Sequence, residues 1–208
     1  MDIASSVAPN HHASYPGFAG ITGLLAAATM VVGRGSTARW AAALTAVGAD
    51  LRVVDVGCGP GTAVREAADR GALATGVDPA PVMLRVARLL TRSPRITWRR
   101  GAAEALPLPD QSADIVWSIA SVHHWRDLDA GLREVLRVLV PGGRFLAIEA
   151  ATRPGATGHA SHGWTDEQAE VFLERCRAAG LVDGRVERRP RGRHALVAVL
   201  ATRPTVAA

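Results

Sequence analysis

From residue 51 onward, short apolar runs alternate along the chain with segments in which hydrophobic residues recur at helical spacing. Short apolar runs typical of buried strands are LRVVDVG, ALATGVD, RITWRRG, ADIVWSI and GRFLAIEA. Helical periodicity covers 62–70, 81–90 and 128–139, with Gly71 placed to end the first helix and Asp127 to cap the third. Strands alternating with helices predict an α/β fold, a Rossmann-like, doubly wound sheet that is mostly parallel with helices on both faces.

The C-terminal part of the chain predicts a different strand arrangement. Thr165, followed by two acidic residues, is typical of a helix start, and this helix should end at Gly180. Two strands follow, at 181–187 and 195–201, and the loop between them is too short for a parallel crossover. We therefore expect an antiparallel C-terminal strand in the otherwise parallel sheet.

Residues 1–50 do not follow this alternation. Segments 21–32 and 36–47 are typical of two Ala-rich helices, and an irregular arm around Tyr15 and Phe18 precedes them. We expect the helices to pack on the core and the arm to act as a lid. The predicted organisation is an N-terminal arm with two helices, 1–50, followed by the α/β domain, 51–208.

The composition indicates an ordinary globular domain. Hydrophobic residues make up 48% of the 208 residues and charged residues 21%. No apolar stretch reaches the ~20 residues of a membrane-spanning helix, and the N-terminus has no cationic segment before an apolar run. We expect a cytoplasmic protein without a membrane partner. Two cysteines are too few for a disulfide framework and have no zinc-site spacing.

The basic residues narrow the chemistry further. The net charge is +5, and all 24 basic residues are arginine. Mechanisms that need a lysine, such as a Schiff base or the phosphate-binding loop with its Lys, are therefore excluded. The densest arginine cluster is Arg185, Arg188, Arg189, Arg191 and Arg193. This cluster is either a phosphate-binding surface or simply a solvated hairpin.

A glycine-rich turn follows the first predicted strand and precedes a helix. The glycines stand at Gly57, Gly59 and Gly61, with Thr62 where a dinucleotide fingerprint would have its third glycine. Glycines permit close approach of a ligand to the backbone. Asp55 would repel a diphosphate, so we expect a nucleoside-type ligand that is cationic on one side.

These residues carry a resemblance to a known family. DVGCGPG at 55–61 resembles the first motif of the class I S-adenosylmethionine-dependent methyltransferases. Further segments resemble later motifs of that family in the same order: GVDP at 76–79, GAAEALPLPD at 101–110, ADIVWS at 113–118, VHHW at 122–125 and EVLRVLVPGG at 134–143. The resemblance covers residues 51–150 and implies S-adenosyl-L-methionine as cofactor of the domain at 51–208.

The resemblance also implies a set of cofactor-binding residues. Asp78 would bind the ribose hydroxyls or else cap the next helix, and Met83 would lie against the adenine or else in the core. The family often has Asp at the position of Ala102, so adenine contact would fall to the Ala103 backbone and Glu104. The predicted cofactor-binding residues are Tyr15, Asp55, Gly57, Cys58, Gly59, Gly61, Asp78, Pro79, Met83, Ala103, Glu104, Ser118 and His123.

Histidines follow the fourth predicted strand, where the resemblance places the methyl acceptor. Imidazole titrates near neutrality, so His123 and His124 are the predicted catalytic candidates, with a structural hydrogen bond as the alternative. His11-His12 and the pair His159 and His162 could also approach this edge. None of them has the spacing of a metal motif, and we predict no metal site.

The acceptor class follows from an absent motif. Segment 118–121, SIAS, lacks the Asp/Asn-Pro-Pro-aromatic run of members that methylate exocyclic or amide nitrogen, so methylation of adenine N6 or of a glutamine amide is disfavoured. The resemblance therefore favours a small-molecule acceptor of the quinone, sterol or secondary-metabolite type, methylated on O, N or C. The alternatives are an RNA-modifying methyltransferase that uses the arginine cluster, with nucleic acid less favoured, and a non-catalytic S-adenosylmethionine-binding domain. The short insertion after the fifth strand leaves room for a homodimer that completes the pocket.

Overall fold

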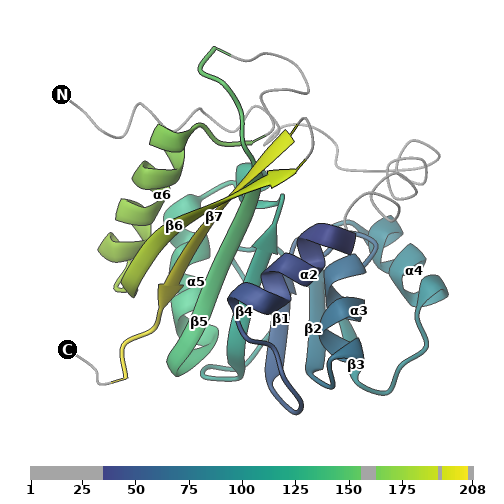
Figure 1. Cartoon of the computed structure of the whole chain (residues 1–208). Helices are drawn as coiled ribbons and strands as arrows, with labels where there is room; N and C mark the ends of the chain where they lie inside the picture. Colours follow the sequence, from purple (N-terminus) through teal and green to yellow (C-terminus); the bar gives the residue numbers. More distant parts are fainter. Residues whose placement is uncertain (1–34, 156–162, 192–193, 206–208) are drawn as a thin grey trace.

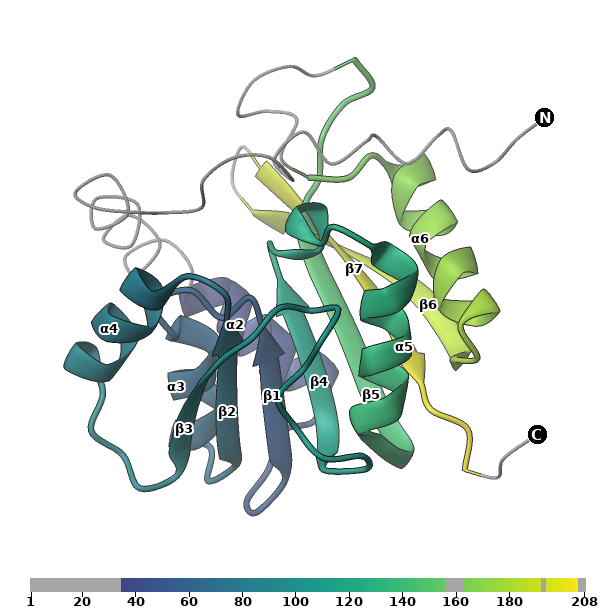
Figure 2. The same ribbon diagram turned by 180° about the vertical axis from the view of Figure 1, so that it is seen from behind.

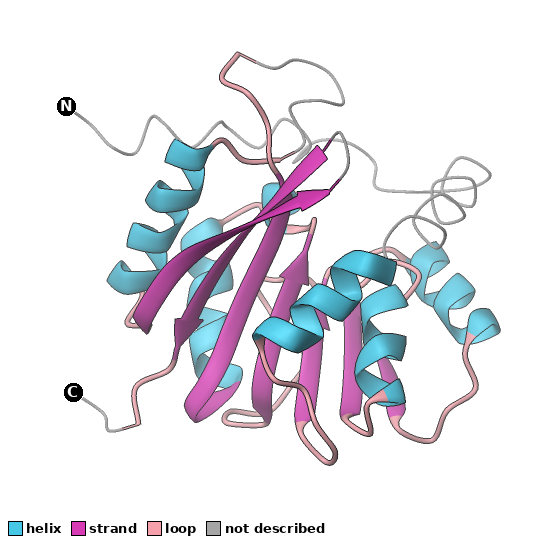
Figure 3. Ribbon diagram, viewed as in Figure 1, coloured by secondary structure: helices cyan, strands magenta, loops and turns pink. Residues whose placement is uncertain are grey.

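A computed structural model describes residues 35–155, 163–191 and 194–205. In this part of the chain the strands form one sheet in the order β3-β2-β1-β4-β5-β7-β6 (Figure 1, Figure 3). Strands β1 to β5 are parallel, and β7 is antiparallel to both β5 and β6. The strands are β1 Arg52–Val56, β2 Leu73–Asp78, β3 Ile96–Arg100, β4 Ala113–Ile119, β5 Leu139–Ala150, β6 Val182–Arg191 and β7 His194–Thr202. The predicted Rossmann-like fold with an antiparallel C-terminal strand is confirmed.

Helices cover both faces of this sheet. They are α2 Gly35–Leu44, α3 Thr62–Asp69, α4 Pro81–Leu90, the 3-10 helix η2 Val122–His124, α5 Leu128–Val138 and α6 Asp166–Ala178. Figure 1 views the face that carries α2 and α3, and Figure 2 turns the molecule so that α5 stands in front. The molecule therefore has the three layers that an alternating βα pattern requires.

Two apolar cores lie on either side of the sheet because successive strand residues point to opposite faces. Val54 and Val116 belong to the core under α5 and α6. Val53, Ile115 and Trp117 belong to the core under α2 and α3. The strand order reverses between β1 and β4, and in open α/β sheets ligands bind at the carboxyl ends of the strands at this point.

The helix boundaries follow the predicted signals. Asp127 caps α5 by accepting from the Ala130 N–H at 2.9 Å. Thr165 forms a capping box with Gln168 at the start of α6. Gly71, with a φ of 88°, follows the end of α3. The residues that start and end these helices in the sequence therefore do so in the fold as well.

Two strands differ from the expected bounds. β6 extends through Arg191, so residues 188–191 pair with β7 instead of forming the loop. Pro190 is tolerated there because β6 is an edge strand. β5 begins at Leu139, before the Pro-Gly-Gly segment, with a register shift in its pairing to β4. Gly142, with a φ of 75°, accommodates this irregularity.

The junction of α5 and β5 is held by a residue far along the chain. Arg203 follows β7, and its Nη1 donates to the carbonyl oxygens of Leu136 at 2.9 Å, Arg137 at 3.3 Å and Leu139 at 2.5 Å. Its backbone also exchanges hydrogen bonds with Gly142 and Gly143. Carbonyl groups at the end of α5, which have no partner within the helix, are thereby satisfied.

The N-terminal part is described only from residue 35. Helix α2 corresponds to the second predicted Ala-rich helix and buries Ala38, Ala41 and Ala42. Thr45 accepts a hydrogen bond from Trp117 Nε1 at 3.1 Å, which fastens the end of α2 to the sheet. The predicted arm and first helix lie outside the described residues. None of the helices in the described part is long and apolar enough to cross a membrane.

Candidate active site

The turn between β1 and α3 is built from glycines because side chains do not fit there. Gly57, Gly59 and Gly61 have φ values of 74°, 52° and 82°, a region that favours glycine. A Cβ on Gly57 would lie 1.8 Å from Ser121 Oγ, and a Cβ on Gly61 would lie 2.2 Å from the Trp98 ring. The tight packing therefore admits only glycine at these two positions. A turn without side chains permits a ligand to approach its backbone closely.

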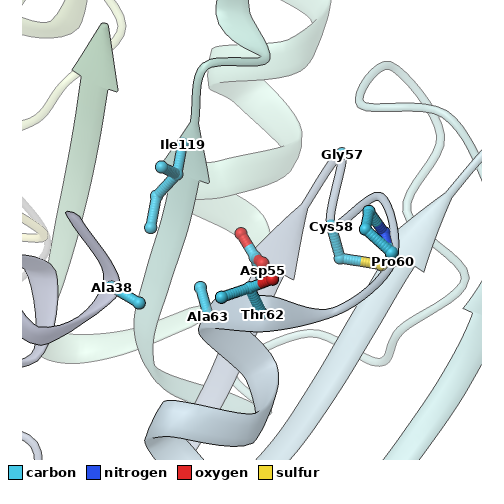
Figure 4. A pocket seen from close by; sticks show the side chains of 8 residues that line it. All are labelled: Ala38, Asp55, Gly57, Cys58, Pro60, Thr62, Ala63 and Ile119. Carbon is cyan, nitrogen blue, oxygen red and sulfur yellow. The ribbon is translucent and has the colours of Figure 1, made fainter. Parts of the chain in front are cut away.

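Asp55 lies under this turn, at the carboxyl end of β1, and is only 4% exposed. It borders a hollow of about 20 Å³, shown in Figure 4. The hollow is lined by Ala38, Asp55, Gly57, Cys58, Pro60, Thr62, Ala63 and Ile119. A space of this size takes one small group, and a carboxylate with so little water around it favours a positively charged group.

Asp78 ends β2 and is also nearly buried, with 7% exposure. Its Oδ2 accepts from the Gly59 N–H at 2.9 Å, and its Oδ1 accepts from the Ala80 N–H at 2.8 Å. Burial raises the pKa of Asp78, and the two backbone hydrogen bonds partly offset this effect. The carboxylate therefore ties the glycine turn to the start of α4, and each oxygen keeps a further lone pair for a ligand hydroxyl.

The other predicted cofactor-binding residues near the glycine turn differ in their burial and contacts. Met83 is 1% exposed, which agrees with the alternative that it lies in the core. Ala103 lies in the core under α5, and Pro79 is exposed. Glu104 Oε1 accepts from the backbone N–H groups of the residues that precede α5, at 2.5 and 3.2 Å. Burial raises the pKa of the Cys58 thiol well above its usual range, which disfavours a nucleophilic role.

A histidine and a carboxylate form a pair at the carboxyl ends of β4 and β5. His123 Nδ1 lies 2.9 Å from Glu149 Oε2. The Glu149 side chain is fully buried, and its Oε1 has no hydrogen-bond partner among the described residues. The His124 ring centroid is 4.0 Å from that of His123, but the His124 side chain is exposed. The buried carboxylate thus orients one of the two predicted catalytic histidines.

Ser118 lies on the same face of the sheet as this pair. It is fully buried, and its hydroxyl has no hydrogen-bond partner within the described ranges. In the β4–β5 register Ser118 stands opposite Ala147, two residues before Glu149. A polar edge therefore runs from the glycine turn across β4 to β5.

Some predicted features lie outside the described residues. These are Tyr15, His11, His12, His159 and His162. Among the described residues, no group of three or more His, Cys, Asp or Glu side chains could hold a metal ion.

The arginine cluster of β6 has partners within the protein. Arg188 Nε lies 2.7 Å from Asp166 Oδ1, and Arg185 Nε lies 3.0 Å from Glu187 Oε1. Arg189 donates to the Ser36 carbonyl oxygen at 3.3 Å, and its guanidinium lies 5.8 Å from the Trp40 ring centroid. Arg188 thus connects β6 to α6 and Arg189 connects it to α2, whereas the Arg185 pair lies within β6. Arg193 lies outside the described residues.

Comparison with known proteins identifies the domain. Residues 54–147 match the family described as "Methyltransferase domain". This segment is therefore similar to known methyltransferase domains. It contains the glycine turn, Asp78 and His123, and the match supports the predicted class I methyltransferase.

Several known proteins are similar to this methyltransferase domain. The demethylmenaquinone methyltransferase of Tropheryma whipplei is 38% identical over 112 residues, which cover 53% of this chain and 46% of that protein. The ubiquinone/menaquinone biosynthesis C-methyltransferase of Rubrivivax gelatinosus is 39% identical over 106 residues, or 50% and 41% of the two chains. The chain thus spans less than half the length of these relatives.

A solved structure extends the likeness beyond the matched segment. The S-adenosylmethionine dependent methyltransferase of Mesorhizobium loti has a TM-score of 0.66 and 26% sequence identity. The likeness covers 83% of this chain and 100% of that one. The sheet and its flanking helices, including the antiparallel strands, therefore belong to the same fold.

Sequence reasoning missed two residues of the site. Glu149 is a carboxylate inside the apolar run FLAIEA, and such a residue in a buried strand is itself a signal of function. Trp98 packs against Gly61 and Gly76 from the edge strand β3. No sequence pattern indicates that contact, because it joins residues from three separate elements.

Proposed function

We propose that this protein transfers the methyl group of S-adenosylmethionine to a small-molecule acceptor. The observation that carries the proposal is the pair of nearly buried carboxylates, Asp55 and Asp78, on adjacent strands around a glycine turn. A ligand with a cationic end and a ribose matches both groups. The methyltransferase domain at 54–147 and the resemblance of the motifs support the same cofactor.

The charges of the chain's residues fit such a cofactor. Asp55 would attract the cationic amino acid end, and the hollow beside it admits one small group. Asp78 would accept hydrogen bonds from the ribose hydroxyls with the lone pairs that Gly59 and Ala80 leave unused. The bare backbone of the glycine turn would then lie against the nucleoside.

The cofactor supplies a methyl group that its own sulfonium charge already activates. When bound, it would offer this methyl carbon to an acceptor lying in line with the carbon–sulfur bond, whose electron pair would stay on sulfur. The protein's main contribution is to position the two reactants, which lowers such barriers by ~7–11 kcal/mol. For an acceptor that loses a proton, His123 takes that proton.

Glu149 gives His123 this capacity as a positioning residue. A carboxylate at Oε2 accepts a hydrogen bond from Nδ1–H, which leaves Nε2 as the basic nitrogen of the ring. When Nε2 takes the proton, the buried carboxylate stabilises the imidazolium. Of the two predicted catalytic histidines, we expect His123 to be the base, because the buried Glu149 carboxylate holds its ring.

A quinol-type molecule is the acceptor class with the strongest support. Two relatives are named for methylation in quinone biosynthesis, although each is matched over less than half its length. The acceptor-side loop around His123 also contains the nearly buried aromatic Trp125. An apolar, ring-shaped acceptor would fit this environment better than a charged one.

The RNA-modifying alternative has less support. Arg188 and Arg185 each lie beside a carboxylate, and Arg189 is engaged with α2. Binding of RNA phosphates would compete with these contacts. The non-catalytic alternative differs from the proposal only in turnover, so turnover measurements distinguish them.

The test combines calorimetry with an acceptor screen. S-adenosylmethionine and S-adenosylhomocysteine should bind the purified protein, and S-adenosylhomocysteine should be released when quinol-type acceptors are added. Absence of binding at millimolar ligand by a folded protein would contradict the cofactor assignment. Binding without release for any acceptor, including RNA, would favour the non-catalytic alternative, and release only with RNA would favour the second candidate.

A further inference from the structure

Helix α4 exposes apolar residues on its outer side as well as burying them on its inner side. Met83, Leu84 and Ala87 are buried against the sheet. At 100° per residue, Leu89 falls on the opposite side of the helix, and it is 83% exposed. The exposed fraction of Leu90, at the end of the helix, is 50%.

Two partly exposed valines complete this outer side. Val82 and Val86 are four residues apart and lie between the inner face and Leu89. A surface helix usually presents polar residues outward, so a helix that is apolar on both sides indicates a surface that is covered in some state. We call Val82, Val86, Leu89 and Leu90 the outer face of α4.

Arginines surround this outer face without any acidic residue. Between Asp78 and Glu104 the sequence has six arginines and neither Asp nor Glu. All six are exposed: Arg85, Arg88, Arg92, Arg95, Arg99 and Arg100. They belong to α4, to the loop after it and to the edge strand β3, at the end of the molecule opposite α6 (Figure 1, Figure 2).

The contacts of these arginines leave most of their charge unneutralised by carboxylates. Arg95 lies 3.2 Å from Asp50, and Arg88 donates to the Trp98 carbonyl oxygen at 3.4 Å. The structure shows no ion pair for Arg85, Arg92, Arg99 or Arg100 with another described residue. The end of the molecule formed by α4 and β3 is therefore both positively charged and apolar.

We propose that the outer face of α4 and its arginines dock onto the surface of a bilayer that contains anionic lipids. Leucines that insert at the boundary of headgroups and acyl chains, beside arginines that contact anionic headgroups, are the combination that holds an interfacial helix. Helix α4 lies at the end of the molecule, where an extended surface can reach it (Figure 1). This proposal departs from the sequence-based expectation of no membrane partner, which rested on the lack of a spanning segment.

Other partners match the surface less well. A nucleic acid would neutralise the arginines but would leave Leu89 and Leu90 in water. A second copy of the chain would bring two positively charged faces together. Residues 1–34 hold one acidic residue, Asp2, and one arginine, so they offer no net negative charge to this surface.

The test is co-sedimentation of the full chain with vesicles. The probe is phosphatidylcholine with 30% phosphatidylserine, against phosphatidylcholine alone, at physiological salt. We expect binding to the anionic vesicles only, and its loss at high salt because the charges are screened. Two variants test the charged and the apolar parts of the surface separately. They are Arg85→Gln/Arg88→Gln/Arg92→Gln and Leu89→Ser/Leu90→Ser.

Each variant should lower the partition coefficient by at least about tenfold. Matched controls replace exposed residues elsewhere, Arg126→Gln/Arg133→Gln on the α5 side and Val182→Ser on β6, and should bind as the unmodified protein does. Circular dichroism checks that every variant is folded. The replaced residues are exposed, so folding should be retained.

Three results would overturn the proposal. The first is no binding to anionic vesicles by the full chain. The second is binding of single-stranded RNA that the arginine variant loses and the leucine variant keeps, with vesicle binding no stronger than that of the controls. The third is a dimer in sedimentation velocity that the leucine variant dissociates, without vesicle binding.

Discussion

The two halves of the sheet build their parts of the site by different means. On the β1–β3 half the backbone forms the site: three glycines with positive φ make a turn, and Asp78 holds it by accepting from backbone N–H groups. On the β4–β7 half a side-chain pair, His123 and Glu149, stands at the strand ends. On the first half a side chain does not fit at Gly57 or Gly61, whereas the second half depends on two side chains that a substitution would replace.

This difference suits the two ligands that we propose. A cofactor that is always the same can be bound by a fixed backbone shape. An acceptor that differs between enzymes needs side chains that can be exchanged while the scaffold stays intact. Substitutions on the first half should therefore disturb folding and cofactor binding together, and those on the second should disturb turnover alone.

Gly57→Ala should have the largest effect. The added Cβ would lie 1.8 Å from Ser121 Oγ at a φ of 74°, so strain and overpacking together should cost about 2–6 kcal/mol of stability. Thermal unfolding and calorimetry with S-adenosylmethionine should show a lower Tm and no binding. Gly155→Ala, at a φ of 78° with open space around it, should show only the backbone strain. Equal losses in both variants would mean that packing against Ser121 is unimportant.

His123→Ala should come next, with kcat lowered by about 10²-fold for an acceptor that must lose a proton. Cofactor affinity and Tm should change little, because the ring is on the other half of the sheet. His124→Ala is the matched control and should retain most activity. Glu149→Gln should lower kcat less than His123→Ala, because the ring remains but is less firmly oriented. An unchanged kcat in a folded Glu149→Gln variant would remove Glu149 from proton transfer.

Asp78→Ala should weaken cofactor binding by ~1.5–3 kcal/mol and should also lower stability, since it leaves the N–H groups of Gly59 and Ala80 without their acceptor. Titration calorimetry and chemical denaturation measure the two effects. Asp69→Ala, an exposed acid on α3, serves as control. Lost stability with unchanged affinity would make Asp78 a structural cap and not a ribose ligand.

The smallest effect concerns acid stability. Hydrogen bonds from Arg137 hold the pKa of Glu134 below its usual 4.5, and the Leu106 N–H contributes to the same shift. A carboxyl group whose pKa is lower in the folded protein than in the unfolded chain stabilises the fold at pH values above its ordinary pKa. This stabilisation is lost as the pH falls through the pKa of the folded state. Glu134→Gln should therefore lose about 1 kcal/mol at neutral pH, and the difference from the unmodified protein should shrink below about pH 4. A constant difference at all pH values would contradict this origin.

The sequence predicts the β1–β3 half better than the other half. Alternating periodicity and the glycine spacing indicate the sheet, the turn and the two acidic strand ends, because each signal is local. The hydrogen bond from Gly59 to Asp78 joins residues on two strands, and no local pattern shows it. Likewise, the pairing of Arg188 to Arg191 with β7 overrides their loop-like composition, since the strand partner decides where β6 ends.

The site on the other half depends on tertiary contacts. His123 and His124 are equivalent in the sequence, and only the position of Glu149 at the end of β5 distinguishes them. Cys58 and Met83 match motifs of the family, yet both are buried as ordinary core residues would be. Burial and pairing between distant segments are the properties that a periodic pattern does not report.

The position of Arg203 has a consequence for the order of folding during synthesis. The carbonyl groups of Leu136, Arg137 and Leu139 accept hydrogen bonds from a side chain that the ribosome adds more than sixty positions later. Until then the end of α5 is held only by backbone hydrogen bonds such as that from the Gln111 N–H to the Arg137 carbonyl oxygen. The nascent chain can thus form the β1–β3 half early, whereas the β4–β5 half, with the His123–Glu149 pair, becomes fully stable only after β7 has joined the sheet.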